Sequence, residues 1–310
     1  MTALICGSVA YDTIMQFPEP FRDHLPAGRV EVLSVCFTAP EMRREYGGCA
    51  GNVAYTLKLL GGDPRPMATV GHDFGPYASW MDANGVDRRF VTEVDAFTAQ
   101  AFITTDSESN QLTTFHPGAM NHAHLNSVGD AGAVDIGIVT PDGRDAMVRH
   151  AEEFADLGVR FIFDPGQQMH LFGPAELARF LDRTTWLTVN AYEWSLIQER
   201  SGLDPDDIVS RVEAVVVTRG DEGSTILVRG REPEIIPAVA VPRAVDPTGC
   251  GDAYRAGLLL GLEAGHDWAT TGRIASLAGA IKVAHPGCQN HRFDADSFAA
   301  RFREEFGYSV

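Results

Sequence analysis

The sequence lacks the features of an exported or membrane-inserted protein. No basic stretch and no long hydrophobic run precedes the first apolar segment, residues 3–6, so neither a signal peptide nor a membrane span is expected. Cysteines are few, form no CxxC pair and are odd in number, which favours reduced thiols; they are Cys6, Cys36, Cys49, Cys250 and Cys288. We therefore predict a cytoplasmic protein that does not bind a membrane.

Basic residues are also scarce. The chain of 310 residues has 25 Lys and Arg against 42 Asp and Glu, which gives a formal net charge of -17. This charge argues against nucleic acid as the main partner, because binding a phosphate backbone requires a broad basic surface. A small anionic ligand remains compatible with it, since a few backbone N–H groups can bind such a ligand locally.

Two common nucleotide-binding signatures are missing as well. The chain contains no G-x-x-x-x-G-K-[ST] motif, which argues against a P-loop NTPase. Gly249 and Gly251 are not followed by a third glycine three residues later, where Tyr254 stands. A nicotinamide dinucleotide site is therefore a poor second choice.

The pattern that is present indicates an α/β fold. Short apolar runs alternate with helical segments; the runs cover residues 3–6, 66–70, 136–140, 160–164, 185–190 and 214–218. This alternation predicts a doubly wound, mostly parallel central sheet, with residues 7–12 as a turn after the first run. Ligands bind such sheets beyond the carboxyl ends of the strands, where Asp164, Asn190 and Thr218 stand.

Two segments interrupt this alternation. Residues 17–45 contain several prolines and predict an irregular excursion, with a short strand around residues 30–37. Residues 100–105 and 111–115 flank a polar turn and predict a β-hairpin. No repeat and no flexible linker divides the chain, so we expect one α/β domain, residues 1–310, that carries a small β lid.

A glycine-rich turn, residues 246–252 (DPTGCGD), leads into an apolar helical segment. Gly249 and Gly251 allow backbone N–H groups to converge on an anion, and the helix start adds a positive dipole end. Asp252 then has two interpretations. It is either a general base beside a transferring group or an ordinary acidic residue in the first turn of a helix.

Other motifs leave alternatives open. Asn190 and Glu193 have the spacing of a capping box, or they help to hold a hydrated Mg²⁺. Residues 218–223 form either a turn towards a nucleotide phosphate or a plain hairpin. The pair His122 and His124 has metal-ligand spacing without an identifiable partner, so solvated loop histidines are the expected interpretation.

The ordered set of motifs carries a resemblance. Residues 47–52 (GGCAGN), Asn190-x-x-Glu193 and residues 246–252 together resemble the ribokinase-like (PfkB) family of carbohydrate and nucleoside kinases, over essentially the whole chain. Residues 42–52 and 115–120 look most like the bacterial adenosine or broad-specificity nucleoside kinases. The resemblance thus implies transfer of the γ-phosphoryl group of ATP to a nucleoside 5′-hydroxyl, with adenosine as the expected acceptor.

The resemblance also implies roles for individual residues. Asp252 would deprotonate the hydroxyl, and the N–H groups of Gly249, Cys250 and Gly251 would form the anion hole. Asn190 and Glu193 would bind Mg²⁺ and phosphate, largely through water. The ribose hydroxyls would be held by Asp12, Gly48 and Asn52.

Further residues are predicted around these. Phe115 and Met120 would pack on the nucleobase or in the lid core, and Asp164 would bind substrate. The ATP site would be completed by Thr218, Arg219, Gly220, Gly223 and Thr248. The lid would comprise residues 13–46 and 97–118, and the protein would be a monomer or a homodimer joined through it.

The resemblance leaves three points open. A K⁺ ion is allowed near residues 246–252 and 282–291, where the family often binds one through carbonyl groups. Cys250 stands where the family usually has alanine. The alternatives to a nucleoside kinase are a sugar kinase for ribose or a related furanose, and a non-catalytic nucleoside-binding regulator, against which the intact Asp252 argues.

Overall fold

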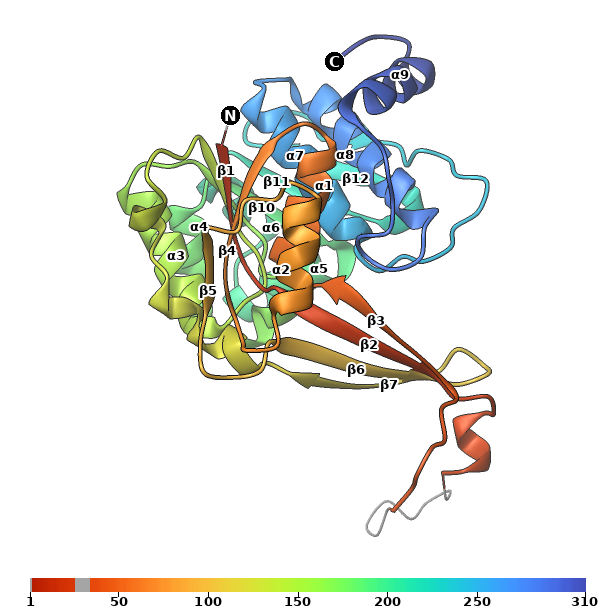
Figure 1. Ribbon diagram of the computed structural model, residues 1–310. Helices are drawn as coiled ribbons and strands as arrows, with labels where there is room; N and C mark the ends of the chain where they lie inside the picture. Colours follow the sequence, from red (N-terminus) through yellow and green to blue (C-terminus); the bar gives the residue numbers. More distant parts are fainter. Residues whose placement is uncertain (1, 26–33) are drawn as a thin grey trace.

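A computed structural model describes residues 2–25 and 34–310, which form two sheets (Figure 1). The larger sheet has nine strands in the order β13-β12-β11-β10-β9-β8-β1-β4-β5. In chain order these strands are β1 (Thr2–Cys6), β4 (Asp63–Val70), β5 (Phe90–Glu93), β8 (Ile136–Val139), β9 (Phe161–Phe163), β10 (Trp186–Asn190), β11 (Ala214–Thr218), β12 (Ser224–Val228) and β13 (Glu234–Ile236).

The pairing confirms the predicted doubly wound, mostly parallel sheet. All neighbours from β5 to β11 run parallel, while β12 and β13 add an antiparallel edge. The carboxyl ends of the parallel strands therefore meet at one edge of the sheet. Among the described residues, no helix has the length and apolar character needed to cross a membrane.

Helices cover both faces of this sheet, because alternate residues of its buried strands point to opposite sides. Ala3 and Ile5 of β1 belong to one core and Leu4 and Cys6 to the other. The first face is covered by α1 (Cys49–Leu59), α2 (Gly75–Ala83), α7 (Cys250–Glu263), α8 (Trp268–Val283) and α9 (Ala295–Phe306). The second is covered by α3 (Arg144–Asp156), α4 (Pro174–Arg183), α5 (Ala191–Ser201) and α6 (Pro205–Arg211).

The smaller sheet projects from the body (Figure 1) and has the order β3-β2-β6-β7. Its strands are β2 (Ala10–Gln16), β3 (Glu41–Gly47), β6 (Ala99–Thr105) and β7 (Gln111–His116). The hairpin β6–β7 confirms the prediction for residues 100–115. β2 runs parallel to β6 and antiparallel to β3.

Two sequence predictions for this sheet were wrong. The predicted turn, residues 7–12, includes 10–12, and the predicted irregular segment, residues 17–45, includes 41–45, yet residues 10–12 and 41–45 lie in strands. The partners of β2 come from segments distant in the chain, so local pattern did not reveal the pairing. The strand expected around residues 30–37 falls partly on residues 26–33, which lie outside the described residues, and residues 34–37 form no strand.

The helical termini follow local sequence rules more closely. Asp267, a residue type favoured at helix N-caps, accepts a hydrogen bond from the N–H of Thr270 at the start of α8. The helices α2, α4, α6 and α9 were not predicted. α9 has alternating apolar and charged residues and begins at a capping box formed by Asp294 and Ser297, a signal that could have located it.

Candidate active site

Two glycine-led helix starts meet at the carboxyl edge of the large sheet. Gly249 precedes α7 with φ 79° and Gly48 precedes α1 with φ 83°. The side-chain amide of Asn52, in the first turns of α1, donates a hydrogen bond of 2.8 Å to the carboxylate of Asp252 in the first turn of α7. The structure thus brings together two motifs that are 200 residues apart in the chain.

Asp252 occupies an environment suited to a proton acceptor. Burial is the main cause that raises the pKa of its carboxyl to about 6, and Asp164 raises it further. The guanidinium of Arg255 and the hydrogen bonds from Asn52 and Cys49 act in the opposite direction. A carboxyl with this pKa is ionised at neutral pH and still basic enough to accept a proton.

The α7 turn presents free donors to the same point. The N–H of Cys250 donates to the carbonyl of Pro247 at 3.1 Å, and the N–H of Ala253 donates to Gly249. No acceptor among the described residues takes the N–H groups of Gly249, Gly251 and Asp252. The predicted anion hole is therefore corrected at Cys250, whose N–H closes the turn and is not a free donor.

Asp164 forms a buried pair with Arg255 behind these groups. Its Oδ1 accepts from Arg255 Nη2 at 2.6 Å, Oδ2 contacts Nε, and both side chains are nearly inaccessible. Because both oxygens are engaged, the prediction that Asp164 binds substrate is corrected to a supporting role. Arg255 was missed by sequence reasoning, although its position three residues after Asp252 places both on one helix face.

Asp12 lies on the inner face of the small sheet, the face that looks towards Asp252. Glu45, Asp12, Ala101 and Phe115 are directly opposite one another across its four strands, so their side chains share this face. Burial, followed by repulsion from Asp252, raises the pKa of the Asp12 carboxyl to about 6. A Cβ at Gly47 would lie 2.6 Å from Asp12 Oδ2, so glycine leaves room for this carboxylate.

Phe115 and Met120 have different surroundings. Phe115 is 48% exposed on the inner face of the small sheet, where an aromatic ring is available to a ligand. Met120 is 5% exposed and packs with Ala10 and Ala99 at the base of that sheet. Of the two interpretations made for Met120, the structure supports lid core.

Asn190 and Glu193 form a reciprocal capping box at the start of α5. Asn190 Oδ1 accepts from the N–H of Glu193, and Glu193 Oε2 accepts from the N–H of Asn190, both at 2.8 Å. Burial, and then the charge of Asp164, raise the pKa of the Glu193 carboxyl. The capping interpretation is therefore correct; Glu193 Oε1 and the side-chain NH₂ of Asn190 remain for another contact.

The charges near Glu193 fit a divalent cation that is bound largely through water and phosphate. Asp164, Glu193 and Asp252 face a single guanidinium, that of Arg255, which leaves an excess of negative charge. No three His, Cys, Asp or Glu side chains within residues 2–25 and 34–310 are placed to hold an ion directly. The exposed His122 accordingly belongs to no such group.

Residues 218–223 form a hairpin connection between β11 and β12, and a contact of this hairpin with a nucleotide phosphate stays a prediction. Thr218 is the direct neighbour of Asn190 across β10 and β11, and Arg219 and Gly220 are exposed beside it. Gly223 has φ 88°, and a Cβ there would lie 2.1 Å from the carbonyl of Ile236. This turn, together with the exposed Thr248, is open to a nucleotide.

Gln289 is a second residue that sequence reasoning missed. Its amide nitrogen donates to Asn52 Oδ1 at 3.0 Å and to the hydroxyl of Tyr77, while its oxygen accepts from Trp80. Gln289 thereby fixes which way the Asn52 amide points. No local motif marks it, since its partners are more than 200 residues away.

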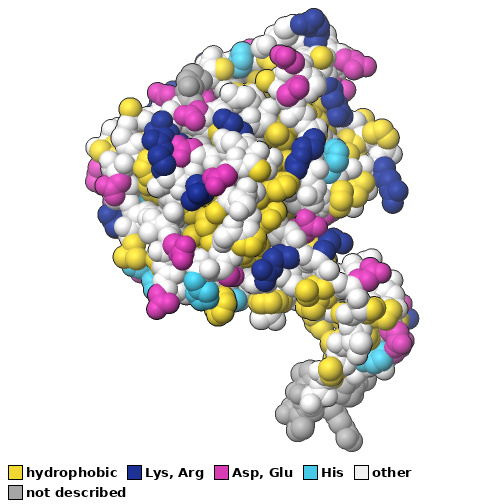
Figure 2. All heavy atoms as spheres, viewed as in Figure 1, with side chains coloured by type: hydrophobic (Ala, Val, Ile, Leu, Met, Phe, Trp, Pro, Cys, Tyr) yellow, Lys and Arg dark blue, Asp and Glu magenta, His cyan; other side chains and the backbone are white. Residues whose placement is uncertain are grey.

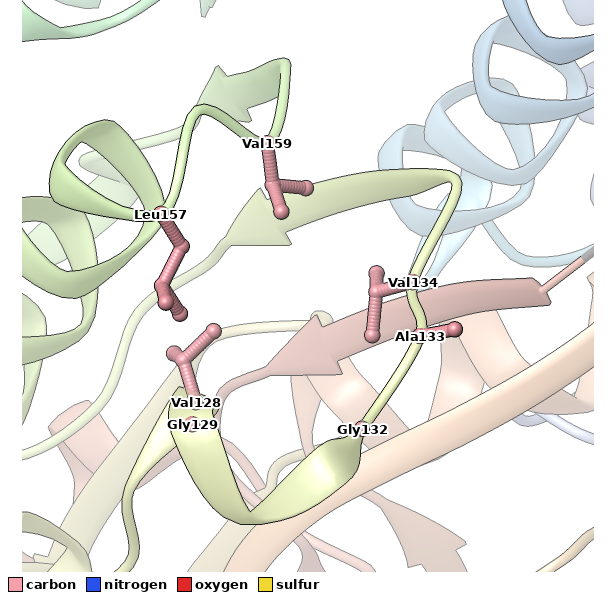
Figure 3. A pocket seen from close by; sticks show the side chains of 7 residues that line it. All are labelled: Val128, Gly129, Gly132, Ala133, Val134, Leu157 and Val159. Carbon is pink, nitrogen blue, oxygen red and sulfur yellow. The ribbon is translucent and has the colours of Figure 1, made fainter.

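A cavity of about 260 Å³ lies at the opposite edge of the sheet, near the amino ends of β8 and β9 (Figure 3). Val128, Val134, Leu157 and Val159 line it, and it contains no charged side chain. It is therefore not the reaction centre. In Figure 2 the molecule is instead hollowed where the small sheet leaves the body.

The sequence matches known kinases over nearly its whole length. The profile of the pfkB family of carbohydrate kinases matches residues 11–294. A nucleoside kinase from Methanothermobacter thermautotrophicus is 31% identical over 98% of this chain and 96% of its own length.

Solved structures agree with this match. A nucleoside kinase from Burkholderia thailandensis in complex with inosine is 51% identical, with a TM-score of 0.90 and 99% of both chains covered; a further structure of it is in complex with ADP-inosine. A nucleoside kinase from Methanocaldococcus jannaschii, an archaeal member of the ribokinase family, is 26% identical with a TM-score of 0.89, over 98% of both chains.

Proposed function

Since this chain belongs to the pfkB family of carbohydrate kinases, we propose that it is an ATP-dependent kinase that phosphorylates the 5′-hydroxyl of a purine nucleoside. The meeting of Asp252, Asn52 and Asp12 beside a row of free N–H groups supports this reaction more than any other observation. The family resemblance of the sequence favours adenosine as the acceptor, whereas the structure of the Burkholderia thailandensis relative contains inosine. Adenosine and inosine are therefore the acceptors to compare first.

Asp252 acts as the general base in this proposal. With a pKa of about 6, its carboxyl is ionised at pH 7 and accepts the proton of the acceptor hydroxyl as that oxygen attacks the γ-phosphorus. The hydrogen bond from Asn52 to Oδ2 orients the carboxylate, and a carboxylate oxygen can accept the hydroxyl proton in addition to such a bond. The leaving group is the β-phosphate oxygen of ADP.

The N–H groups of Gly249, Gly251 and Asp252 stabilise the charge on the transferring phosphoryl group. They are rigid, because the turn is closed by the hydrogen bond from Cys250 to Pro247 and the helix α7 continues from it. Donors fixed before the reaction cost no reorganisation in the transition state. The positive end of the α7 dipole acts in the same direction.

Glu193 would help to hold Mg²⁺ near the phosphates through its remaining oxygen and intervening water, and Asn190 would contact the phosphates or that water through its amide. When bound, Mg²⁺ neutralises charge on the β- and γ-phosphates. Thr218, Arg219, Gly220, Gly223 and Thr248 would contact the ATP. The K⁺ ion allowed by the resemblance is not part of this proposal, because the buried ammonium of Lys282 lies on the carbonyl of Asp246.

Recognition of the nucleoside is assigned to both sides of the hollow. Asp12 and the Gly48 turn would hold the ribose hydroxyls, since one carboxylate can accept from two neighbouring hydroxyls. Phe115 offers an aromatic ring to the base on the same inner face. We propose that the four-stranded sheet is the lid of one domain, and that its closure over the sugar excludes water.

The outer face of this lid favours the homodimer over the monomer. Met42, Phe102 and Leu112 are exposed there, and their strand register places all three on the face opposite Asp12. Exposed apolar side chains clustered on one sheet face are typical of an interaction surface. Analytical ultracentrifugation of the protein, alone and with nucleoside, measures whether it is a monomer or a homodimer.

The decisive experiment is an acceptor panel that measures ADP formation with adenosine, inosine, guanosine, cytidine and ribose. We expect kcat/KM to be at least about a hundredfold higher for the best purine nucleoside than for ribose, because ribose lacks the base that Phe115 and the lid would bind. Preferential turnover of ribose would replace the proposal by the sugar kinase. Binding of nucleosides without turnover would indicate the non-catalytic regulator.

A further inference from the structure

The lysine content of the chain is unusual, and one lysine is deeply buried. The sequence has 25 Lys and Arg, but only Lys58 and Lys282 are lysines. Lys282, in the last turn of α8, has an exposed fraction of 0%. Burying an ammonium group is costly unless it is fully coordinated, so this position requires an explanation.

Backbone carbonyl groups coordinate the ammonium. Lys282 Nζ donates to the carbonyl oxygen of Asp246 at 2.7 Å and to that of His285 at 3.2 Å. The C-terminal end of α8, which bears the negative end of the helix dipole, adjoins the same point. The ammonium therefore occupies a small cage of carbonyl oxygens, of the kind that also suits an ion such as K⁺.

Asp246 connects this cage to the anion-binding turn. Its Oδ1 accepts from the N–H of Thr248 at 2.9 Å and its Oδ2 from the N–H of Gly287 at 2.8 Å. Its own N–H donates to the carbonyl of Val283 at 3.1 Å. The backbone N–H and C=O of Asp246 are thus tied to the last turn of α8, its Oδ2 to the segment that follows α8 and its Oδ1 to the turn itself. Lys282 supplies the cation of that attachment.

The charge of Lys282 reaches the turn itself. Burial dominates and raises the pKa of the Cys250 thiol to about 11, but Lys282 is the largest influence that lowers it. The ammonium thus adds positive potential at the position where the phosphoryl group would be bound.

We propose that Lys282 is a positioning residue that serves as a built-in monovalent cation: its ammonium fixes the carbonyl of Asp246 and so holds the free N–H groups of the α7 turn towards the phosphoryl group. This inference rests on the proposed kinase function. It implies that the protein needs no added K⁺, because a tethered cation already fills the carbonyl cage.

The first test compares the wild-type protein in Na⁺ and in K⁺ buffers at equal ionic strength. We expect kcat to differ by less than about twofold, since the cage is already filled. A wild-type kcat that rises tenfold or more with K⁺ would overturn the proposal. This measurement requires no variant, so it remains valid whether or not substitutions at Lys282 fold.

The second test removes the ammonium. In Lys282→Ala we expect kcat to fall about tenfold to a hundredfold, in the range observed when one contact of an anion hole is lost, with the KM for nucleoside changed less than twofold. Added NH₄⁺, methylammonium or K⁺ should restore part of kcat, because each can occupy the vacated cage. Lys58→Ala, which also removes a lysine from the last turn of a helix, is the matched control and should keep full activity.

A binding readout separates this inference from the proposed function. Calorimetry with a non-hydrolysable ATP analogue should give a Kd about tenfold weaker for Lys282→Ala than for Lys58→Ala, because the turn that binds the terminal phosphate is no longer fixed. Equal Kd values in two folded variants, or no rescue by any cation, would overturn the role of Lys282. If the wild type binds the analogue but phosphorylates no nucleoside, the proposed function fails while this comparison stands.

Discussion

The two helix starts at the centre of the site are similar in sequence and different in charge. α1 begins Gly48-Cys49-Ala50-Gly51-Asn52 and α7 begins with residues 249–252 (GCGD). Each follows a glycine of positive φ and carries a cysteine as its first helical residue. The α1 start ends in a neutral amide, whereas the α7 start ends in a carboxylate.

We propose that this difference suits the two helix starts to two kinds of ligand. A neutral amide both donates and accepts, which suits sugar hydroxyls and the orientation of Asp252. A carboxylate accepts a proton, which suits the reacting hydroxyl. The two glycines share a positive φ but differ in ψ, 138° at Gly48 and 2° at Gly249. In the proposed reaction α1 would serve recognition and α7 chemistry, and the hydrogen bond between Asn52 and Asp252 would couple them.

Substitution of Asp252 in the α7 start should lower the activity more than substitution of Asn52 in the α1 start. Asp252→Asn should lower kcat on the order of a hundredfold to ten-thousandfold, because the general base is lost. Asn52→Ala should cost about tenfold to a hundredfold in kcat/KM, the value of one hydrogen bond to a charged group. Steady-state kinetics of both variants test this; turnover by Asp252→Asn within a few-fold of wild type would remove the base assignment.

Alanine at Gly48 and at Gly249, the N-cap glycines of α1 and α7, should lower the free energy of unfolding by different amounts. At Gly48 a Cβ would lie 2.6 Å from the backbone nitrogen of Ala10 and from the carbonyl oxygen of Ser8, so Gly48→Ala should cost on the order of 3 kcal/mol in free energy of unfolding. At Gly249 a Cβ would meet the Cys288 side chain at 3.1 Å.

Gly249→Ala should therefore cost only about 1 kcal/mol, mainly from the left-handed backbone. Urea unfolding of both variants gives these values. Equal losses would mean that the two glycines are required only for their φ angles, and not for the close backbone approach at Gly48.

The pH dependence of the activity should show the ionisation of the Asp252 and Asp12 carboxyls near pH 6. The pKa values of Asp252 and Asp12 are raised to about 6, in each case chiefly by burial. Because the base must be ionised, kcat/KM should fall about tenfold per pH unit as the pH drops below about 6, and the two groups should titrate as a pair.

Asp12→Asn is the control for this coupling. Asp252 contributes to the raised pKa of Asp12, and such repulsion is mutual, so removing the Asp12 charge should move the acidic limb of kcat to lower pH. A shift of the acidic limb to higher pH, or a kcat that does not change with pH near 6, would contradict the assignment of Asp252 as the base.

Cys49 and Cys250, the first helical residues of α1 and α7, should react only slowly with alkylating agents. A helix start usually lowers a thiol pKa, but here burial is the main cause that raises the pKa of Cys250 to about 11 and that of Cys49 well above its usual value. Iodoacetamide should therefore modify the exposed Cys36 first, without loss of activity, and Cys250 slowly.

Modification of Cys250 should inactivate the protein, and ATP should protect it, because the thiol lies in the turn that would bind phosphate. Peptide mass spectrometry at timed intervals, alongside the activity, measures both rates. Full activity after complete modification of Cys250 would mean that this turn does not face the phosphates.

The sequence alone was sufficient for features that depend on neighbouring residues. The alternation of apolar runs predicted the parallel strands, and the Asn190–Glu193 spacing predicted the capping box that the structure contains. The glycines of both helix starts were recognisable because their backbone angles are a local requirement. The wrong predictions, residues 10–12 and 41–45, concern a sheet whose strands pair over long separations.

Only the tertiary structure decided which charges are available. Asp164 ends a strand as predicted, but the guanidinium of Arg255 occupies both its oxygens, and the ammonium of Lys282 reaches Asp246 across 36 residues. A residue's charge can be read from the sequence, whereas its desolvation and its partner depend on which segments fold against it. For this protein the sequence determined the two glycine-led helix starts, and the fold determined that the carboxylate of one meets the amide of the other.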